Sequence, residues 1–151
     1  MTQTPPIDDI ARTLVAIAEA DSDIVAVARK PEGGWVVARG EEDRVEIDLD
    51  ASDGRLVLMQ WAGRPNPARR TEALAALLTY SSMWAETGHV RAALDGPEGD
   101  AMLIADILPQ VLTEAHLRAV IAGLSEKAGI VRELIEADAA GADGPEAVIR
   151  I

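Results

Sequence analysis

Three stretches of the chain place apolar residues at helical spacing. The first covers residues 5–20 and predicts an amphipathic surface helix, because its apolar residues recur every three or four positions. These residues are Ile7, Ile10, Leu14 and Ile17. The second helix is predicted to run from the capping residue Asn66 to the stop signal Gly88, and the third and longest from Thr113 to Ala137.

Between the first two helices, short segments rich in β-branched residues are separated by turns. We predict extended segments at residues 24–28, 35–39, 45–50 and 56–61, joined as an antiparallel meander. In the third segment aliphatic residues alternate strictly with Glu and Asp, so one face is buried and the other is acidic and wet. The fourth segment is almost continuously apolar, which favours a central strand or one with an occupied outer face.

The region after the second helix is typical of a hairpin. Residues 90–95 and 102–108 are the two predicted strands, and a Gly-Pro-Glu-Gly-Asp turn joins them. The predicted fold class is therefore α+β: helix, antiparallel meander, helix, hairpin and long C-terminal helix, with one sheet packed with helices. We expect residues 1–137 to form a single domain and residues 138–151 to form a flexible C-terminal tail.

Length and composition narrow the possible classes of protein. The chain has 151 residues, 48% of them apolar but only 3% aromatic, which predicts one core built from aliphatic side chains. No apolar run approaches the ~20 residues that a membrane span needs, and the N-terminus lacks the pattern of a signal peptide. We therefore expect a cytoplasmic protein without a membrane span. The absence of cysteine excludes disulfides and thiolate chemistry.

The chain is rich in Asp and Glu and has a formal net charge of −12. Such a chain repels a phosphate backbone, so nucleic acid is not an expected partner. Two interpretations of the acid remain open at this point. It serves solubility alone, or it also favours binding of basic polypeptide segments.

Motifs for catalysis or metal binding are weak. His89 and His116 are 27 residues apart in no ligand-spaced motif. The segment 48–54 begins like a calcium loop, but Asp53 stands where the loop requires Gly, and Met59 stands where it requires Glu. No glycine-rich phosphate motif and no nucleophile motif occurs. We expect no enzyme activity, cofactor or metal.

Carboxylates remain as the other source of chemistry. Glu41, Glu42 and Glu46 are already explained by a turn and a polar strand face. A small-molecule enzyme would be favoured only by a deep pocket where carboxylates or a histidine converge.

The order of elements resembles the class I type III secretion chaperones and related chaperone-like domains. The resemblance covers roughly residues 7–137. It is carried by the segments Ile7–Leu14, Val45–Leu49, Leu56–Met59 and Glu72–Leu78, and by the last helix from Thr113. The chain departs from the family pattern in the strand-like segment 24–28 and in its tail, which leaves the edge order of the sheet open.

The resemblance implies a homodimeric chaperone that holds the N-terminal region of a secreted client in an extended, secretion-competent form. The alternative is a non-secretory protein-interaction or regulatory domain of the same fold. Expected client-binding residues are Ile10, Leu14, Trp35, Val37, Leu58 and Trp61. Expected dimer residues are Leu74, Leu78, Met83 and Trp84. For each of these positions, ordinary core packing is the competing interpretation.

Overall fold

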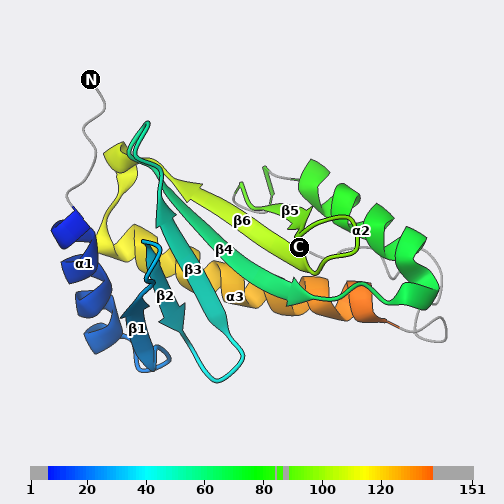
Figure 1. Ribbon diagram of the computed structural model, residues 1–151, viewed down its shortest axis with the longest axis horizontal. Helices are drawn as coiled ribbons and strands as arrows, with labels where there is room; N and C mark the ends of the chain where they lie inside the picture. Colours follow the sequence, from blue (N-terminus) through cyan, green and yellow to red (C-terminus); the bar gives the residue numbers. More distant parts are fainter. Residues whose placement is uncertain (1–6, 84, 87–88, 138–151) are drawn as a thin grey trace. The chain divides into compact units, whose positions relative to one another are not determined.

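The computed structural model describes residues 7–83, 85–86 and 89–137 of the chain (Figure 1). The helices are α1 (Ile7–Ala20), α2 (Arg70–Ser82) and α3 (Glu114–Glu136). The strands are β1 (Ala26–Arg29), β2 (Trp35–Ala38), β3 (Arg44–Leu49), β4 (Leu56–Gly63), β5 (Arg91–Leu94) and β6 (Ala101–Ile107). The strands form one open antiparallel sheet in the order β1-β2-β3-β4-β6-β5, so the predicted α+β class is confirmed.

The chain divides into two compact units. The first comprises Met1–Gln60 and Ala105–Ser125, and the second comprises Trp61–Ile104 and Glu126–Ile151. The division passes through β4, β6 and α3, which contribute residues to both units. That residues 1–137 form a single domain stays a prediction, and the expected tail at 138–151 lies outside the described residues.

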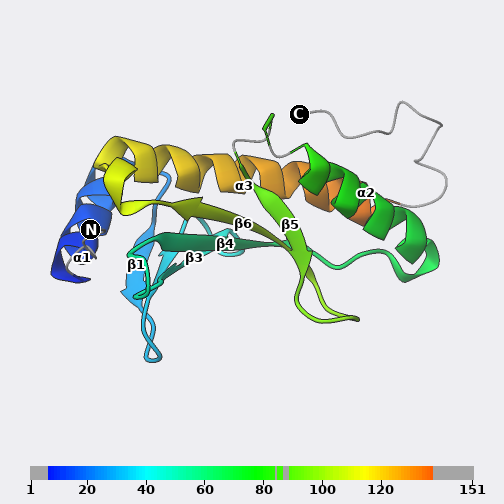
Figure 2. The same ribbon diagram turned by 90° about the horizontal axis from the view of Figure 1, so that it is seen from above.

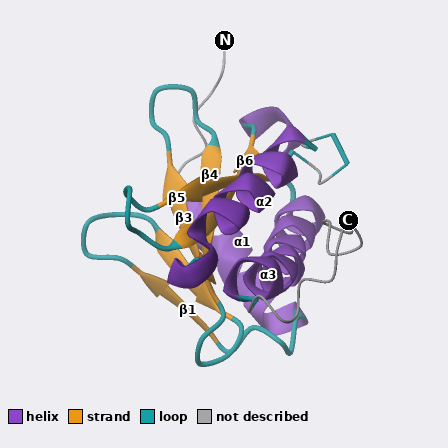
Figure 3. Ribbon diagram, turned by 90° about the vertical axis from the view of Figure 1, so that its right-hand side faces the viewer, coloured by secondary structure: helices purple, strands orange, loops and turns teal. Residues whose placement is uncertain are grey.

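The first unit is a meander covered by helices on one face. Strands β1 to β4 pair antiparallel in sequence, with Trp35 opposite Ile47 and Ile47 opposite Leu58. Figures 2 and 3 show α1 and α3 on the same side of these strands. The buried aliphatic side chains of the two helices are Ile10, Leu14, Ile17, Leu117, Ile121 and Leu124. Burying each such side chain stabilises the fold by about 1.5–3 kcal/mol, which makes this face the core of the unit.

The second unit joins α2 to the β5–β6 hairpin. In the hairpin, Ala92 lies opposite Leu103 and Ala93 opposite Met102. One face of α2 is buried through Ala73, Leu77 and Tyr80, which follow one another at helical spacing.

Most predicted elements are confirmed. The third helix differs from its expected bounds by one residue at each end, and the strand-like segment 24–28 is the edge strand β1. The apolar strand β4 is central, as its composition indicated. The expectation that the second helix continues to Gly88 was wrong, because α2 ends at Ser82. There the Ser82 hydroxyl donates to the Thr79 carbonyl and the Met83 N–H donates to the Tyr80 carbonyl, which closes the helix in a tight turn.

Asn66 joins the ends of two helical segments in the second unit. Its backbone N–H donates to the Ile135 carbonyl at 2.8 Å and its side-chain amide donates to the Ala137 carbonyl at 3.2 Å. Its Oδ1 accepts from the Ala68 N–H at 3.0 Å and so caps the 3₁₀ turn Pro67–Arg69 that leads into α2. One side chain thus satisfies donors and acceptors that a helix cannot satisfy internally.

We expect Asn66→Ala to lower the free energy of unfolding by about 1–2 kcal/mol, because it removes both the cap of the 3₁₀ turn and the hydrogen bond from the side-chain amide to the carbonyl just after α3. Asn66→Asp keeps the capping oxygen but loses the amide donor, so its loss is expected at an intermediate value. Urea denaturation of the three proteins measures the effect. An Asn66→Ala protein as stable as the wild type would show that these bonds contribute nothing.

Candidate functional site

The outer face of the sheet in the first unit is open. None of the described helices lies over the face of β2, β3 and β4 that is turned to the viewer in Figure 1. Along each strand, half-buried residues on this face alternate with buried ones. Its apolar members in the first unit are Val36, Ala38, Val57 and Met59. An open face with a stripe of half-buried apolar side chains is typical of a surface that binds another polypeptide.

Charged residues cross the same face. The Lys30 ammonium lies 2.9 Å from Oδ1 of Asp48, and the Lys30 side chain is only 11% exposed. Burial lowers the pKa of Lys30, but its hydrogen bond with Asp48 and the charges of Asp48, Glu46 and Glu32 outweigh this and raise the pKa above its ordinary value of 10.5. Lys30 is therefore a fixed cation on the open face.

Gly34 makes room for this pair. Its φ is +84°, and a Cβ at this position would lie 2.4 Å from both Oδ1 of Asp48 and the carbonyl oxygen of Ile47. Only glycine combines this backbone conformation with this approach to β3. The Gly33-Gly34 turn thus brings Lys30 onto Asp48.

The two outermost strands have different edges. At β1, the Lys30 N–H donates to the Gly34 carbonyl at 3.0 Å. In antiparallel strands every second residue bonds to the neighbouring strand, so the backbone groups of Ala26 and Ala28 point toward β2. The backbone groups of Val27 and Arg29 therefore point away from the sheet. At β5, the Ser81 hydroxyl accepts from the Ala92 N–H at 2.9 Å and donates to its carbonyl. A side chain of α2 therefore occupies the free edge of β5, whereas the edge of β1 pairs with no other strand of the described chain.

The structure places most of the expected client-binding residues inside the first unit. Ile10, Leu14, Trp35, Val37 and Leu58 are each at most 3% exposed. Their side chains hold the core, and contact with a client at these positions would require the unit to open, so that contact stays a prediction. Trp61, on β4 in the second unit, is half-buried.

The residues on the open side of the strands, Val36, Val57 and Met59, were not among those expected to bind a client. Val36 alternates with Trp35 and Val37, and Met59 follows Leu58. The signal was present as the period-two alternation, but both sides of these strands are apolar. Their composition therefore did not indicate which side the helices cover.

The expected dimer residues lie on α2 and just after it. Leu78 is 74% exposed, and Leu74, one helical turn earlier, is half-buried like Met83. Trp84 lies outside the described residues. On the opposite face of the helix, burial raises the pKa of the Tyr80 hydroxyl to about 12. The helix thus has apolar side chains on both its buried and its exposed face.

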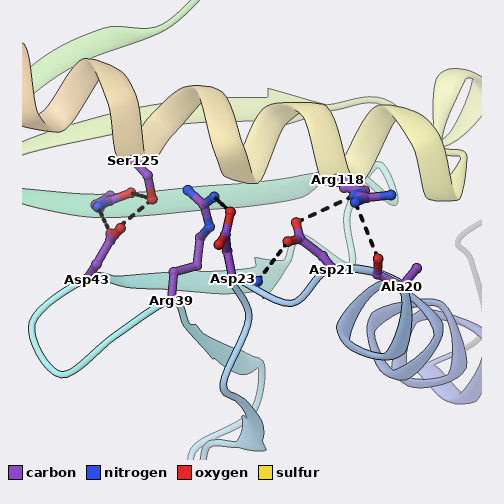
Figure 4. A network of polar contacts seen from close by, with 8 residues as sticks. Ala20, Asp21, Asp23, Arg39, Asp43, Arg118 and Ser125 are labelled. Atoms are coloured by element: carbon purple, nitrogen blue, oxygen red, sulfur yellow. Dashed lines mark hydrogen bonds and ion pairs between the residues drawn. The ribbon is translucent and has the colours of Figure 1, made fainter.

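Carboxylates converge with two arginines in a polar network of the first unit (Figure 4). Asp21 is 8% exposed, accepts a hydrogen bond from the Asp23 N–H at 3.0 Å and lies 3.4 Å from Nε of Arg118. Arg39 lies 3.4 Å from Asp23. The Asp23 N–H lowers the pKa of Asp21 below its ordinary value of 3.8; burial opposes this change, and Arg118 supports it.

A second part of the network lies against the core. Gln60 is 3% exposed, and its amide donates to Oδ1 of Asp43. The Ser125 hydroxyl donates to the same Asp43 oxygen at 2.9 Å and lies 3.3 Å from Oε1 of Gln60. The Gln60 amide, the Ser125 hydroxyl and Oδ1 of Asp43 are thus bonded to one another, and these bonds stabilise the fold of the unit.

No group of three or more His, Cys, Asp or Glu residues in the described part of the chain is placed to hold a metal ion. Among the described helices, none has the length and apolar character needed to cross a bilayer.

The described elements form an α+β fold, and the outer face of β2, β3 and β4 has both apolar and acidic side chains. Residues 31–132 match the model of the Tir chaperone protein (CesT) family. The chain therefore belongs to this family of type III secretion chaperones, and the resemblance seen in the sequence is confirmed. A search of curated proteins found no match.

Solved structures share the fold. The ExsC–ExsE complex matches with a TM-score of 0.69 at 21% identity, over 85% of this chain and 94% of the other. The HopA1–SchA chaperone–effector complex matches with a TM-score of 0.65 at 17% identity, over 85% and 99%. YbjN of E. coli, a proposed transcription regulator, matches with a TM-score of 0.55 at 13% identity, over 90% and 92%. At these identities the matches show the fold alone.

The lowered pKa of Asp21 predicts an acid-sensitive contribution to stability. Ionised Asp21 stabilises the fold at pH values above its ordinary pKa near 3.8, and this contribution is lost as the pH falls through the lower pKa of the folded state. We expect Asp21→Asn to be less stable than the wild type at pH 7, with the difference closing below about pH 4.

Chemical denaturation from pH 2.5 to 7 measures this dependence. Glu98→Gln, in the exposed turn between β5 and β6, removes the same charge and is expected to follow the wild-type curve. A constant difference between Asp21→Asn and the wild type across the range would contradict the assignment.

Proposed function

We propose that this chain is a cytoplasmic, homodimeric chaperone that binds the N-terminal region of a secreted effector and holds it in an extended, secretion-competent form. The observation that carries the proposal is the family match over residues 31–132. The fold shared with the HopA1–SchA chaperone–effector complex supports it.

The first unit offers two features that suit an extended client. The half-buried side chains of Val36, Val57 and Met59 give an apolar surface without a deep cavity. The unpaired edge of β1 offers backbone donors and acceptors to an added strand. An extended segment gains affinity from main-chain hydrogen bonds and specificity from alternate side chains, so binding requires no active site.

The exposed face of α2 supports the homodimer. Leu78 is the most exposed large hydrophobic residue of the described chain, at 74%. Leu74 lies one turn away on the same side of the helix. In a two-fold dimer both copies contribute the same patch, so the interface buries each of these residues once from each copy.

A non-secretory interaction or regulatory domain of the same fold is the second candidate. It is favoured by the likeness to YbjN, because the same architecture occurs there. The two candidates differ in the client: a secretion chaperone binds the N-terminal region of an exported protein, whereas a regulatory domain binds a resident one.

We expect affinity purification of the tagged full chain from its native cells to retain an exported protein in stoichiometric amount. Limited proteolysis is expected to protect the N-terminal region of that protein, and deletion of this region is expected to abolish retention. Mass spectrometry identifies the bound protein and the protected segment. A resident partner, or protection of another region, would favour the regulatory domain, and the absence of any retained protein would contradict both candidates.

We expect Leu78→Lys to convert the dimer into a monomer. Removing two leucines from the interface costs about 3–6 kcal/mol in total, which corresponds to a dissociation constant at least ~100-fold higher. Light scattering after size-exclusion chromatography measures the mass. Val111→Lys changes another exposed aliphatic residue, 51% exposed, and is expected to remain dimeric. A wild-type protein that elutes as a monomer at micromolar concentration would overturn the proposal of a homodimer.

A further inference from the structure

The open face of the first unit contains a carboxylate between two apolar side chains. Glu46 of β3 lies directly opposite Val36 of β2 on one side and Met59 of β4 on the other. Directly opposed residues in antiparallel strands have their Cβ atoms about 4.5–5.5 Å apart. The three side chains therefore form one continuous row across the sheet.

The two carboxylates of β3 on this face differ in their charge partners. Asp48 is paired with Lys30 at 2.9 Å. Glu46 lies two residues earlier on the same face, ~7 Å from Asp48 along the strand. In the described part of the chain, Glu46 has no basic group within ion-pairing distance. The face thus has one carboxylate in a direct ion pair, Asp48, and one, Glu46, that interacts with the charge of Lys30 only at longer range.

Covering this row with a client changes the environment of Glu46. An aliphatic segment laid over Val36 and Met59 removes water from the carboxylate between them, and a charge that loses its water without gaining a partner opposes binding. A segment that also brings a cation replaces the water with a charge-assisted hydrogen bond. The row therefore discriminates between apolar segments by whether they carry a positive charge.

We infer that the outer face of β2–β4 selects a client segment that places Lys or Arg over Glu46 and aliphatic side chains over Val36 and Met59. This inference rests on the proposed chaperone function and names the chemistry of its client. A second copy of the chain does not suit this face, because each copy has a net charge of −12 and would bring further acid to Glu46.

Two fluorescein-labelled peptides test the inference on the full-length protein. The first is Ser-Ile-Ser-Arg-Ser-Ile-Ser, whose Ile and Arg side chains share one face when it is extended, and the second replaces Arg with the uncharged isostere citrulline. We expect the Arg peptide to bind the wild type about tenfold more tightly than the citrulline peptide, and Glu46→Gln to reduce this ratio to about one. Fluorescence anisotropy measures both affinities at low and high salt.

Glu42→Gln is the matched control, because it removes the same charge from the exposed turn before β3 and is expected to leave the tenfold ratio unchanged. Equal binding of the two peptides to the wild type would overturn the inference while leaving the chaperone function to the client purification. Failure of both peptides to bind would overturn it as well.

Two variants test the other possible occupants of the face. If Glu46→Gln shifts the mass of the protein, the face is an interface between copies and the inference fails. Arg150→Gln changes the basic residue of the C-terminal segment of this chain. If it tightens peptide binding more than about fivefold, that segment competes for the face and the assignment to a client is overturned.

Discussion

The structure depends on the two-residue period of the strands in the first unit. Because successive side chains point to opposite faces, burying Trp35, Ile47 and Leu58 under α1 and α3 obliges the residues between them to face outward. A register shift by one residue would bury Glu46 and expose the core. The outer face is thus a consequence of the same burial that holds the unit together.

Polar groups hold this core in register. Gln60 is the one buried amide on the inner side of β4, and Asp43 and Ser125 satisfy it from the β2–β3 turn and from α3. A buried polar group is tolerated only with partners, so this contact specifies how α3 lies against the strands of the unit. Asp21 and Arg118 provide a second link, between the end of α1 and the start of α3. The two carboxylates nearest the core, Asp21 and Asp43, therefore bond to other residues of the fold.

The remaining acid and the remaining apolar surface meet on the open face. The charge of −12 suits solubility, yet Glu46 stands in the middle of an apolar row instead of in a turn. In the inference above, the same carboxylate keeps the face hydrated when it is empty and favours a cation when a client covers it. The two edge strands also differ. The Ser81 hydroxyl bonds to the outer edge of β5, whereas the outer edge of β1 pairs with no strand of the described chain.

The sequence by itself determined the elements, their order and the α+β class, since periodicity, caps and turns are local properties. The capping role of Asn66 and the central position of β4 were also predicted from the sequence. It did not determine where α2 ends: the Ser82 hydroxyl closes the helix on the local Thr79 carbonyl, and only the folded chain brings the Ser81 hydroxyl to Ala92. Nor did it determine which side of β2 and β4 is open, because both sides are apolar. Only the packing of α1 and α3 decided that Trp35 and Leu58 are buried, while Val36 and Met59 flank Glu46 on the surface.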